Sequence, residues 1–190
     1  MRIWTIQTSN ILDVLNTDGV LRSNGICCDE DFAESYRWIS GKLAEKIGPA
    51  PEGIVFPVWG WIRYIGKDFR AWNYSDNLDG KVLIEAEIPD ELILASDFDE
   101  WHCVLNNIPH DCDKEACDEW ERWIDSREGT CDPMPEHVRK LVERSWDGIF
   151  HSDGDTVQGI FWELRKEWIV RVKPMRQTLW RKLRDWFNGN

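Results

Sequence analysis

The sequence predicts a single α+β domain in which small antiparallel or mixed sheets are flanked by helices. The length of 190 residues is that of one domain. The composition, 42% hydrophobic and 31% charged, is typical of a globular chain. Segments with alternating apolar residues and segments with apolar residues three or four positions apart are interspersed, which indicates strands mixed with helices.

The first fifty residues predict a strand followed by two helices. Residues 3–8 alternate and are rich in β-forming side chains. A helix over residues 10–16 can be capped by Asn10, and the pair Val20-Leu21 predicts a short extended segment. A second helix begins at Asp29 or Asp31 and carries an apolar stripe at helical spacing, formed by Phe32, Tyr36, Ile39, Leu43 and Ile47.

The middle of the chain predicts three strands and a short helix. Residues 54–65 are an aromatic β run, and residues 81–88 alternate as a strand after a loop rich in Gly, Asn and Asp. Residues 92–95 predict another short strand. A helix through Asn106 follows, capped by Ser96 or Asp97.

The last third predicts two helices, a long strand and a final strand. Residues 115–127 look helical and lie in the most acidic part of the chain. Pro135 can start the next helix. Residues 157–164 are apolar nearly throughout and predict one strand, and residues 170–172 predict the last. We therefore expect one domain over residues 1–175, with an acidic helical insertion at about 110–150.

Residues 176–190 predict a separate basic, amphipathic tail helix. One stripe carries Leu179, Trp180, Leu183, Trp186 and Phe187, opposite a face of Lys and Arg. Such a helix can dock on the chain's own acidic segment, which we favour. It can also occupy a partner's groove or lie on a membrane, so a protein partner through this tail stays open.

The net charge of −12 argues against broad nucleic-acid binding, because a phosphate backbone is gripped by a cationic face. The start of the chain has no apolar signal region, and no stretch is long and apolar enough to span a membrane. The six Cys residues form no C-x-x-C pair. These features together predict a cytoplasmic protein with mostly free thiols.

A zinc site is an alternative interpretation of one polar region. His110, Cys112, Cys117 and Cys131 lie close together in the sequence, with His102 or Cys103 nearby. Zinc sites usually show paired ligands at tight spacing, and that signature is missing here. No metal is therefore expected.

Three clusters are candidates for a binding site in this chain of 13 Trp residues. Alternation places Thr5 and Gln7 on one face of the first strand, where two polar groups need partners or line a site. A second cluster, with Trp59, Trp61, Arg63 and Arg70, suits an aromatic ligand that carries phosphate. The third, residues 96–102, includes Trp101. Ordinary packing and helix capping are the alternative for each.

Four segments resemble a bacterial family of small cytosolic proteins of unknown function. They are the opening WTIQ, the segment PVWGWIRY with the later DFR, the segment IPDELILASDFDEWHCVLN, and the closing VQGIFWELRKEWIVRVKPM. They occur in the same order over residues 3–175.

The order of elements also resembles the ADP-ribosyltransferase fold, from the first strand through SDFDEW to a late strand running into residues 167–169. That fold holds NAD in a cleft between two small sheets. The resemblance implies that Thr5 and Gln7 face the nicotinamide end, and that Trp59, Trp61 and Arg63 line the cleft.

The resemblance also implies a catalytic carboxylate on the late strand, at a position that falls near Gln158. Gln cannot supply the negative charge that stabilises a developing cation. Glu163 lies an odd number of residues away on the same predicted strand and should face the other side.

The leading hypothesis is therefore an ADP-ribosyltransferase-like domain that binds NAD or a related nucleotide, with weak or absent transfer activity. The competing hypothesis is a non-enzymatic protein–protein interaction module that uses the tail helix or an acidic face.

Overall fold

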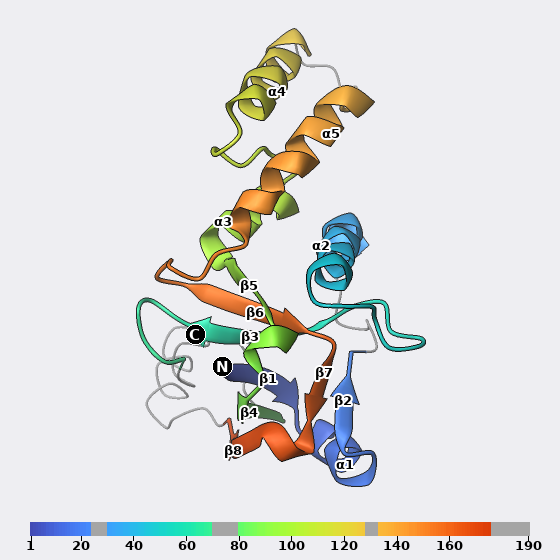
Figure 1. Ribbon diagram of the computed structural model, residues 1–190, viewed down its shortest axis with the longest axis vertical. Helices are drawn as coiled ribbons and strands as arrows, with labels where there is room; N and C mark the ends of the chain where they lie inside the picture. The colour runs from blue at the N-terminus through green and yellow to red at the C-terminus, as the bar shows by residue number, and fades with distance from the viewer. Residues whose placement is uncertain (24–29, 70–79, 128–132, 176–190) are drawn as a thin grey trace, which may run out of the picture.

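A computed structural model describes residues 1–23, 30–69, 80–127 and 133–175 (Figure 1). Its centre is a six-stranded sheet in which neighbouring strands are antiparallel. The strands are, in sheet order, β5 (Leu94–Asp97), β6 (Val157–Phe161), β3 (Val58–Arg63), β1 (Arg2–Thr8), β4 (Lys81–Glu87) and β8 (Ile169–Pro174). The predicted α+β class is confirmed.

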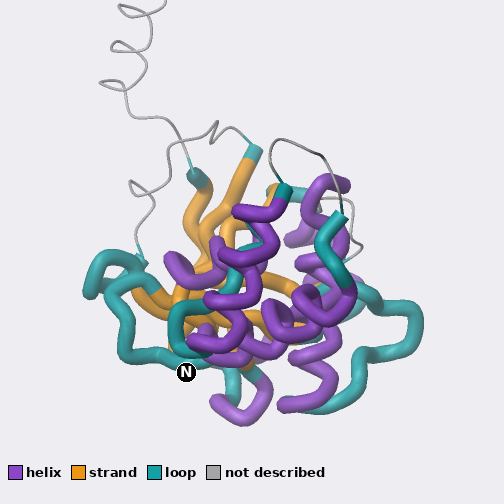
Figure 2. The backbone as a smooth tube through the Cα atoms, turned by 90° about the horizontal axis from the view of Figure 1, so that it is seen from above, coloured by secondary structure: helices purple, strands orange, loops and turns teal. Residues whose placement is uncertain are grey.

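Two apolar clusters lie on opposite faces of this sheet, as the alternation of strand side chains requires. Ile160 belongs to a cluster with α2 (Ala33–Lys46), α3 (Phe98–Leu105) and α5 (Glu136–Ser145). The next residue, Phe161, belongs to a cluster with α1 (Ile11–Thr17) and the strands β1 and β4. Seen from above, most of the helices lie in front of the strands (Figure 2).

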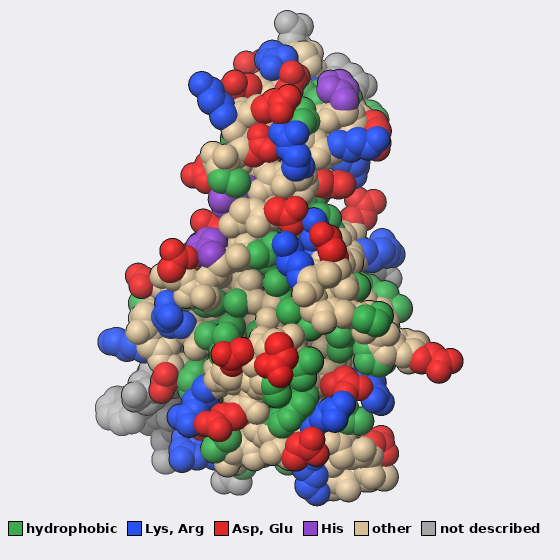
Figure 3. Space-filling view, viewed as in Figure 1, with side chains coloured by type: hydrophobic (Ala, Val, Ile, Leu, Met, Phe, Trp, Pro, Cys, Tyr) green, Lys and Arg blue, Asp and Glu red, His purple; other side chains and the backbone are tan. Residues whose placement is uncertain are grey.

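The helix α4 (Lys114–Ser126) pairs with α5, and the two project from the body of the molecule (Figure 1). This is the segment predicted as an acidic helical insertion. Arg144 near the end of α5 joins the start of α4 by contacts of 2.8 Å to both Asp113 and Glu115. Acidic and basic side chains are interspersed over the projecting pair on the face shown in Figure 3.

The single strand predicted over residues 157–164 is wrong. The chain breaks at Trp162, whose indole donates to the carbonyl of Gly48 at 2.8 Å. β7 (Glu163–Arg165) then leaves the main sheet and pairs with β2 (Val20–Arg22) in a second, two-stranded sheet. A nearly continuous apolar run does not reveal such a break, because the buried residues of β6 and Leu164 of β7 follow each other closely in the sequence.

Several predicted ends of helices and strands differ from those in the structure. Asn10 makes no side-chain cap at α1 and instead accepts a hydrogen bond from Thr8. Residues 54–57 precede β3 instead of belonging to it, and Pro57, which has no N–H to donate, is the last residue before the strand. By contrast, Asp97 caps α3 as one of the two predicted residues.

Outside the described residues lie the position of Arg70, that of Cys131 and the tail helix predicted over residues 176–190. Within the described ranges, the helices are all too short or too polar to cross a membrane.

Candidate ligand-binding site

A pocket of about 380 Å³ opens on the face of the sheet that carries α2 and α3. Its walls come from the strands β1, β3 and β6 and from these two helices. The lining residues are Thr5, Ile6, Tyr36, Trp59, Gly60, Trp61, Phe98, Trp101, His102, Leu105 and Gln158. We call it the aromatic pocket.

Strand register sets the row of side chains across its base. Gln158 on β6 lies opposite Trp61 on β3 and opposite Ser96 on β5. Directly opposed residues of antiparallel strands project to the same face. The row therefore places one amide between an indole and a hydroxyl.

Aromatic rings pack closely around the row. The ring of Trp101 lies 5.3 Å from that of Trp59 and 6.1 Å from that of Tyr36. The Trp61 ring lies 4.9 Å from that of Phe98 and stacks on Phe69 at 5.6 Å with the planes 6° apart. Such mutual packing fixes the orientation of each ring before any ligand arrives.

Gln158, at the base of the pocket, is only 6% exposed, and its Nε2 has no hydrogen-bond partner within the described part of the chain. The hydroxyl of its neighbour Ser96 is also buried and unpartnered there, but Ser96 does not line the pocket. Buried polar groups are nearly always paired, so an unpaired amide that lines a pocket indicates a position for a ligand or water atom.

His102 stands at the exposed side of the pocket. Its Nδ1 lies 3.0 Å from the carbonyl oxygen of Phe98 and 3.2 Å from that of Asp99. Carbonyl oxygens only accept, so Nδ1 carries the hydrogen. In the neutral form of the ring, Nε2 then keeps the lone pair.

Asp97 and Arg63 hold the start of α3 in place. The carboxylate of Asp97 accepts hydrogen bonds from the backbone of Asp99 and Glu100 at 2.8 and 3.1 Å. Arg63 donates to the carbonyls of Ser152 and Gly154 at 3.3 and 2.7 Å. This loop packs against Asp97, and the position of α3 in turn sets those of Trp101 and His102.

Five of the predicted site residues line the aromatic pocket. They are Thr5, Trp59, Trp61, Trp101 and Gln158. Gln7 lies behind them, where it donates to the hydroxyl of Thr5 at 2.8 Å. That hydroxyl donates to the carbonyl of Trp59 at 2.7 Å, so Thr5 and Gln7 share a face as predicted.

The other predicted site residues do not join the pocket. Arg63 is committed to the loop carbonyls, and Arg70 lies outside the described residues. Glu163 is not on the strand of Gln158, which corrects the prediction. It lies on β7, where its carboxylate pairs with Arg22 and Arg165.

Sequence reasoning misses Tyr36, which it assigns to the apolar stripe of its helix. Phe98 and His102 belong to the third candidate cluster, residues 96–102, for which a capped helix over the core is the favoured alternative. The signal that would favour a site is the aromatic residue at the start of α3 followed by His102 one turn later, on the same side of the helix. Nothing local indicates that α2 brings Tyr36 there.

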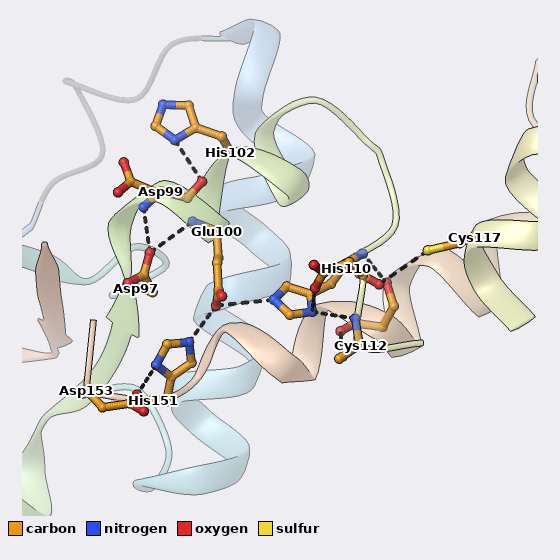
Figure 4. Close-up of polar contacts among 11 residues, drawn as sticks. Asp97, Asp99, Glu100, His102, His110, Cys112, Cys117, His151 and Asp153 are labelled. Carbon is orange, nitrogen blue, oxygen red and sulfur yellow. Dashed lines mark hydrogen bonds and ion pairs between the residues drawn. The ribbon is translucent and has the colours of Figure 1, made fainter. Parts of the chain in front are cut away.

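A second polar cluster lies beside the pocket, on the other side of α3 (Figure 4). Oε2 of Glu100 lies 2.6 Å from Nε2 of His151 and 3.2 Å from Nε2 of His110. His151 also contacts Asp153 through Nδ1. The hydrogen bond with Glu100 is the main reason that the pKa of His151 is raised above its usual value.

The residues considered for zinc are engaged in other contacts. Nδ1 of His110 accepts from the backbone N–H of Cys112 at 3.2 Å, and the Cys117 thiol lies 3.7 Å from the His110 carbonyl. Burial raises the pKa of the Cys112 and Cys117 thiols, and this disfavours the thiolate form that binds a metal. Within the described ranges no group of three His, Cys, Asp or Glu side chains is placed to hold a metal, and Cys131 lies outside them.

Comparison with protein families gives one match, to a domain of unknown function, DUF3841, over residues 2–170. The chain belongs to the DUF3841 family. The match spans almost all of the described fold and confirms the resemblance to a family of unknown function. No curated protein matches the chain.

Proposed function

We propose that this member of the DUF3841 family binds NAD or a related nucleotide by holding the planar ring of the ligand in the aromatic pocket. The observation that carries the proposal is that Gln158, which lines a pocket walled by aromatic rings, has a buried amide nitrogen without a partner among the described residues. Ligand sites typically combine such apolar walls with a few placed polar groups. A volume of about 380 Å³ suits one ring system with a substituent.

The walls favour a flat ligand. Trp59, Trp61 and Trp101 offer large ring surfaces at the pocket, and planar rings gain from stacked or edge-to-face contacts with them. The remainder of a nucleotide would extend from the open side beside His102. We therefore expect the ring to supply most of the affinity.

The proposal is binding with weak or absent transfer activity. No Asp or Glu is among the described residues that line the pocket. Gln158 occupies the position where the fold resemblance would place a carboxylate, and a neutral amide cannot stabilise a developing cation in the same way. We expect no release of free nicotinamide from NAD above the uncatalysed rate, measured by chromatography.

The interaction-module alternative has less support. Its tail helix lies outside the described residues, and its acidic face on the projecting α4–α5 pair is interspersed with basic side chains in the view of Figure 3. A pocket with an unpartnered donor is the more specific feature.

Isothermal titration calorimetry with NAD, ADP-ribose and nicotinamide tests the proposal. We expect saturable binding of NAD that weakens about tenfold or more in Trp61→Ala, whereas Trp123→Ala is the matched control. Trp123 lies on α4 and packs against Arg127, away from the pocket. Circular dichroism shows whether each variant folds. An absence of saturable heat with all three ligands up to millimolar concentration would contradict the proposal.

A further inference from the structure

We infer that the edge of the ligand that enters the aromatic pocket is uncharged and carries a carbonyl oxygen, as in a carboxamide or lactam, and that Gln158 selects it. This inference rests on the proposed ring binding and specifies the chemical class of the ring. It follows from the hydrogen-bonding capacity and the charge of the described pocket residues.

Gln158 offers a free hydrogen-bond donor at the base of the aromatic pocket. Nε2 of Gln158 has no partner within the described residues, although the residue is only 6% exposed. A buried N–H that stays unpaired is costly, so a ligand acceptor placed there is favoured over an apolar edge. An amide nitrogen donates and does not accept, so it reads a carbonyl or a bare ring nitrogen.

The pocket also lacks a cation that could balance a charged ligand. None of the described residues that line it is Lys or Arg. A carboxylate ligand would lose its hydration without gaining a cation. An amide carries no such penalty.

His102 offers a hydrogen-bond acceptor at the open side of the aromatic pocket. With Nδ1 of His102 committed to backbone carbonyls, its Nε2 can accept a hydrogen bond. A primary carboxamide or a lactam presents both a carbonyl and an N–H. The pocket thus offers one donor and one acceptor to a group that needs both.

Calorimetry with three pyridines that share one ring tests the inference. Nicotinamide carries a neutral carboxamide, nicotinate carries a carboxylate and 3-methylpyridine carries neither. We expect nicotinamide to bind about tenfold or more tightly than either analogue, since a hydrogen bond to a buried donor is worth about one such factor. This comparison of three ligands uses only the wild-type protein. Its result therefore does not depend on whether variants of the site fold.

Two variants then assign the selection to Gln158. Gln158→Leu should weaken nicotinamide about tenfold and leave 3-methylpyridine unchanged, because only the hydrogen bond is removed. Gln158→Glu should instead favour the cationic 3-(aminomethyl)pyridine. Gln7→Leu is the control, because Gln7 is an amide of the same sheet, on β1, that does not line the pocket.

Two results would overturn the inference, and they are distinguishable. Equal binding of the three pyridines would show that a ring pocket exists but does not read the carbonyl, which leaves the proposed function intact. An absence of binding by all three, together with an absence of NAD binding, would reject the ring pocket and the inference with it.

Discussion

At the residue scale, the pocket depends on contacts that lie just outside it. Gly154 lies so close to Asp97 that a Cβ on this glycine would meet the Asp97 carboxylate at 1.9 Å. The same carboxylate caps α3 and therefore helps to fix Trp101. A side chain on the loop would displace the cap, since both cannot occupy the space.

We accordingly predict that Gly154→Ala lowers the free energy of unfolding by about 1–2 kcal/mol, the usual range for loss of an N-cap. Urea denaturation measures it. Gly41→Ala is the matched control, because a Cβ there would meet nothing within 4 Å and Gly41 lies inside α2. This control should be neutral or stabilising, as Ala favours helix. Equal behaviour of the two variants would contradict the close contact.

The contact between His151 and Glu100 predicts a pH dependence. The pKa of His151 is raised on folding, chiefly by its hydrogen bond with Glu100. The stabilisation from this contact is therefore fully present below the pKa of His151 in the unfolded chain. It is lost as the pH rises through the pKa of His151 in the folded protein. Glu100→Gln should therefore lower stability more at about pH 5.5 than at about pH 8.5, by roughly 0.5–1 kcal/mol for a partly exposed pair.

Urea denaturation at the two pH values measures this difference. Exposed Glu91 is the control, and Glu91→Gln should change stability equally at both. Facing groups that share the cluster are His110, which contacts Glu100, and Asp153, which contacts His151. A larger effect of Glu100→Gln at the higher pH would contradict the assignment.

At the element scale, the projecting α4–α5 pair is joined at its base by Asp113. This residue caps α4 by accepting from the backbone of Ala116 at 3.1 Å and also binds Arg144 of α5 at 2.8 Å. The backbone hydrogen bond with Ala116 comes first and the contact with Arg144 second in lowering the pKa of Asp113. The residue thus connects two elements as well as starting one.

Asp113→Ala should destabilise the protein by about 1–2 kcal/mol through loss of the cap and the ion pair. Asp118→Ala, on the exposed part of the same helix, is the control and should change stability by less than about 0.5 kcal/mol. Chemical denaturation followed by circular dichroism compares the two. Similar losses for both would show that Asp113 has no special role.

Most elements were predictable because their signals are local. The alternation of residues 81–88 and the apolar stripe of the helix ending near residue 47 each report one element. The division of the late strand into β6 and β7 was not predictable, because the break at Trp162 depends on a contact with Gly48, more than a hundred residues away. Long-range hydrogen bonds of this kind leave no periodic signal.

At the scale of the whole molecule, the pocket is assembled from distant parts of the chain. Aromatic content marks Trp59 and Trp61, so these were predictable. Tyr36 was not, because its helix reaches the pocket only through packing on the sheet. Arg63 was expected at a ligand and instead binds loop carbonyls, since the sequence does not show where a loop will pass.

The most direct test of the central claim is the location of ligand binding by NMR. Indole N–H signals of the 13 Trp residues can be assigned by single substitutions and followed during titration with nicotinamide. We predict saturable shifts for Trp59, Trp61 and Trp101, which line the pocket, and none for Trp123 or Trp168, which do not. Shifts confined to Trp123 or Trp168, or none at saturating ligand, would contradict a ring-binding site in the aromatic pocket.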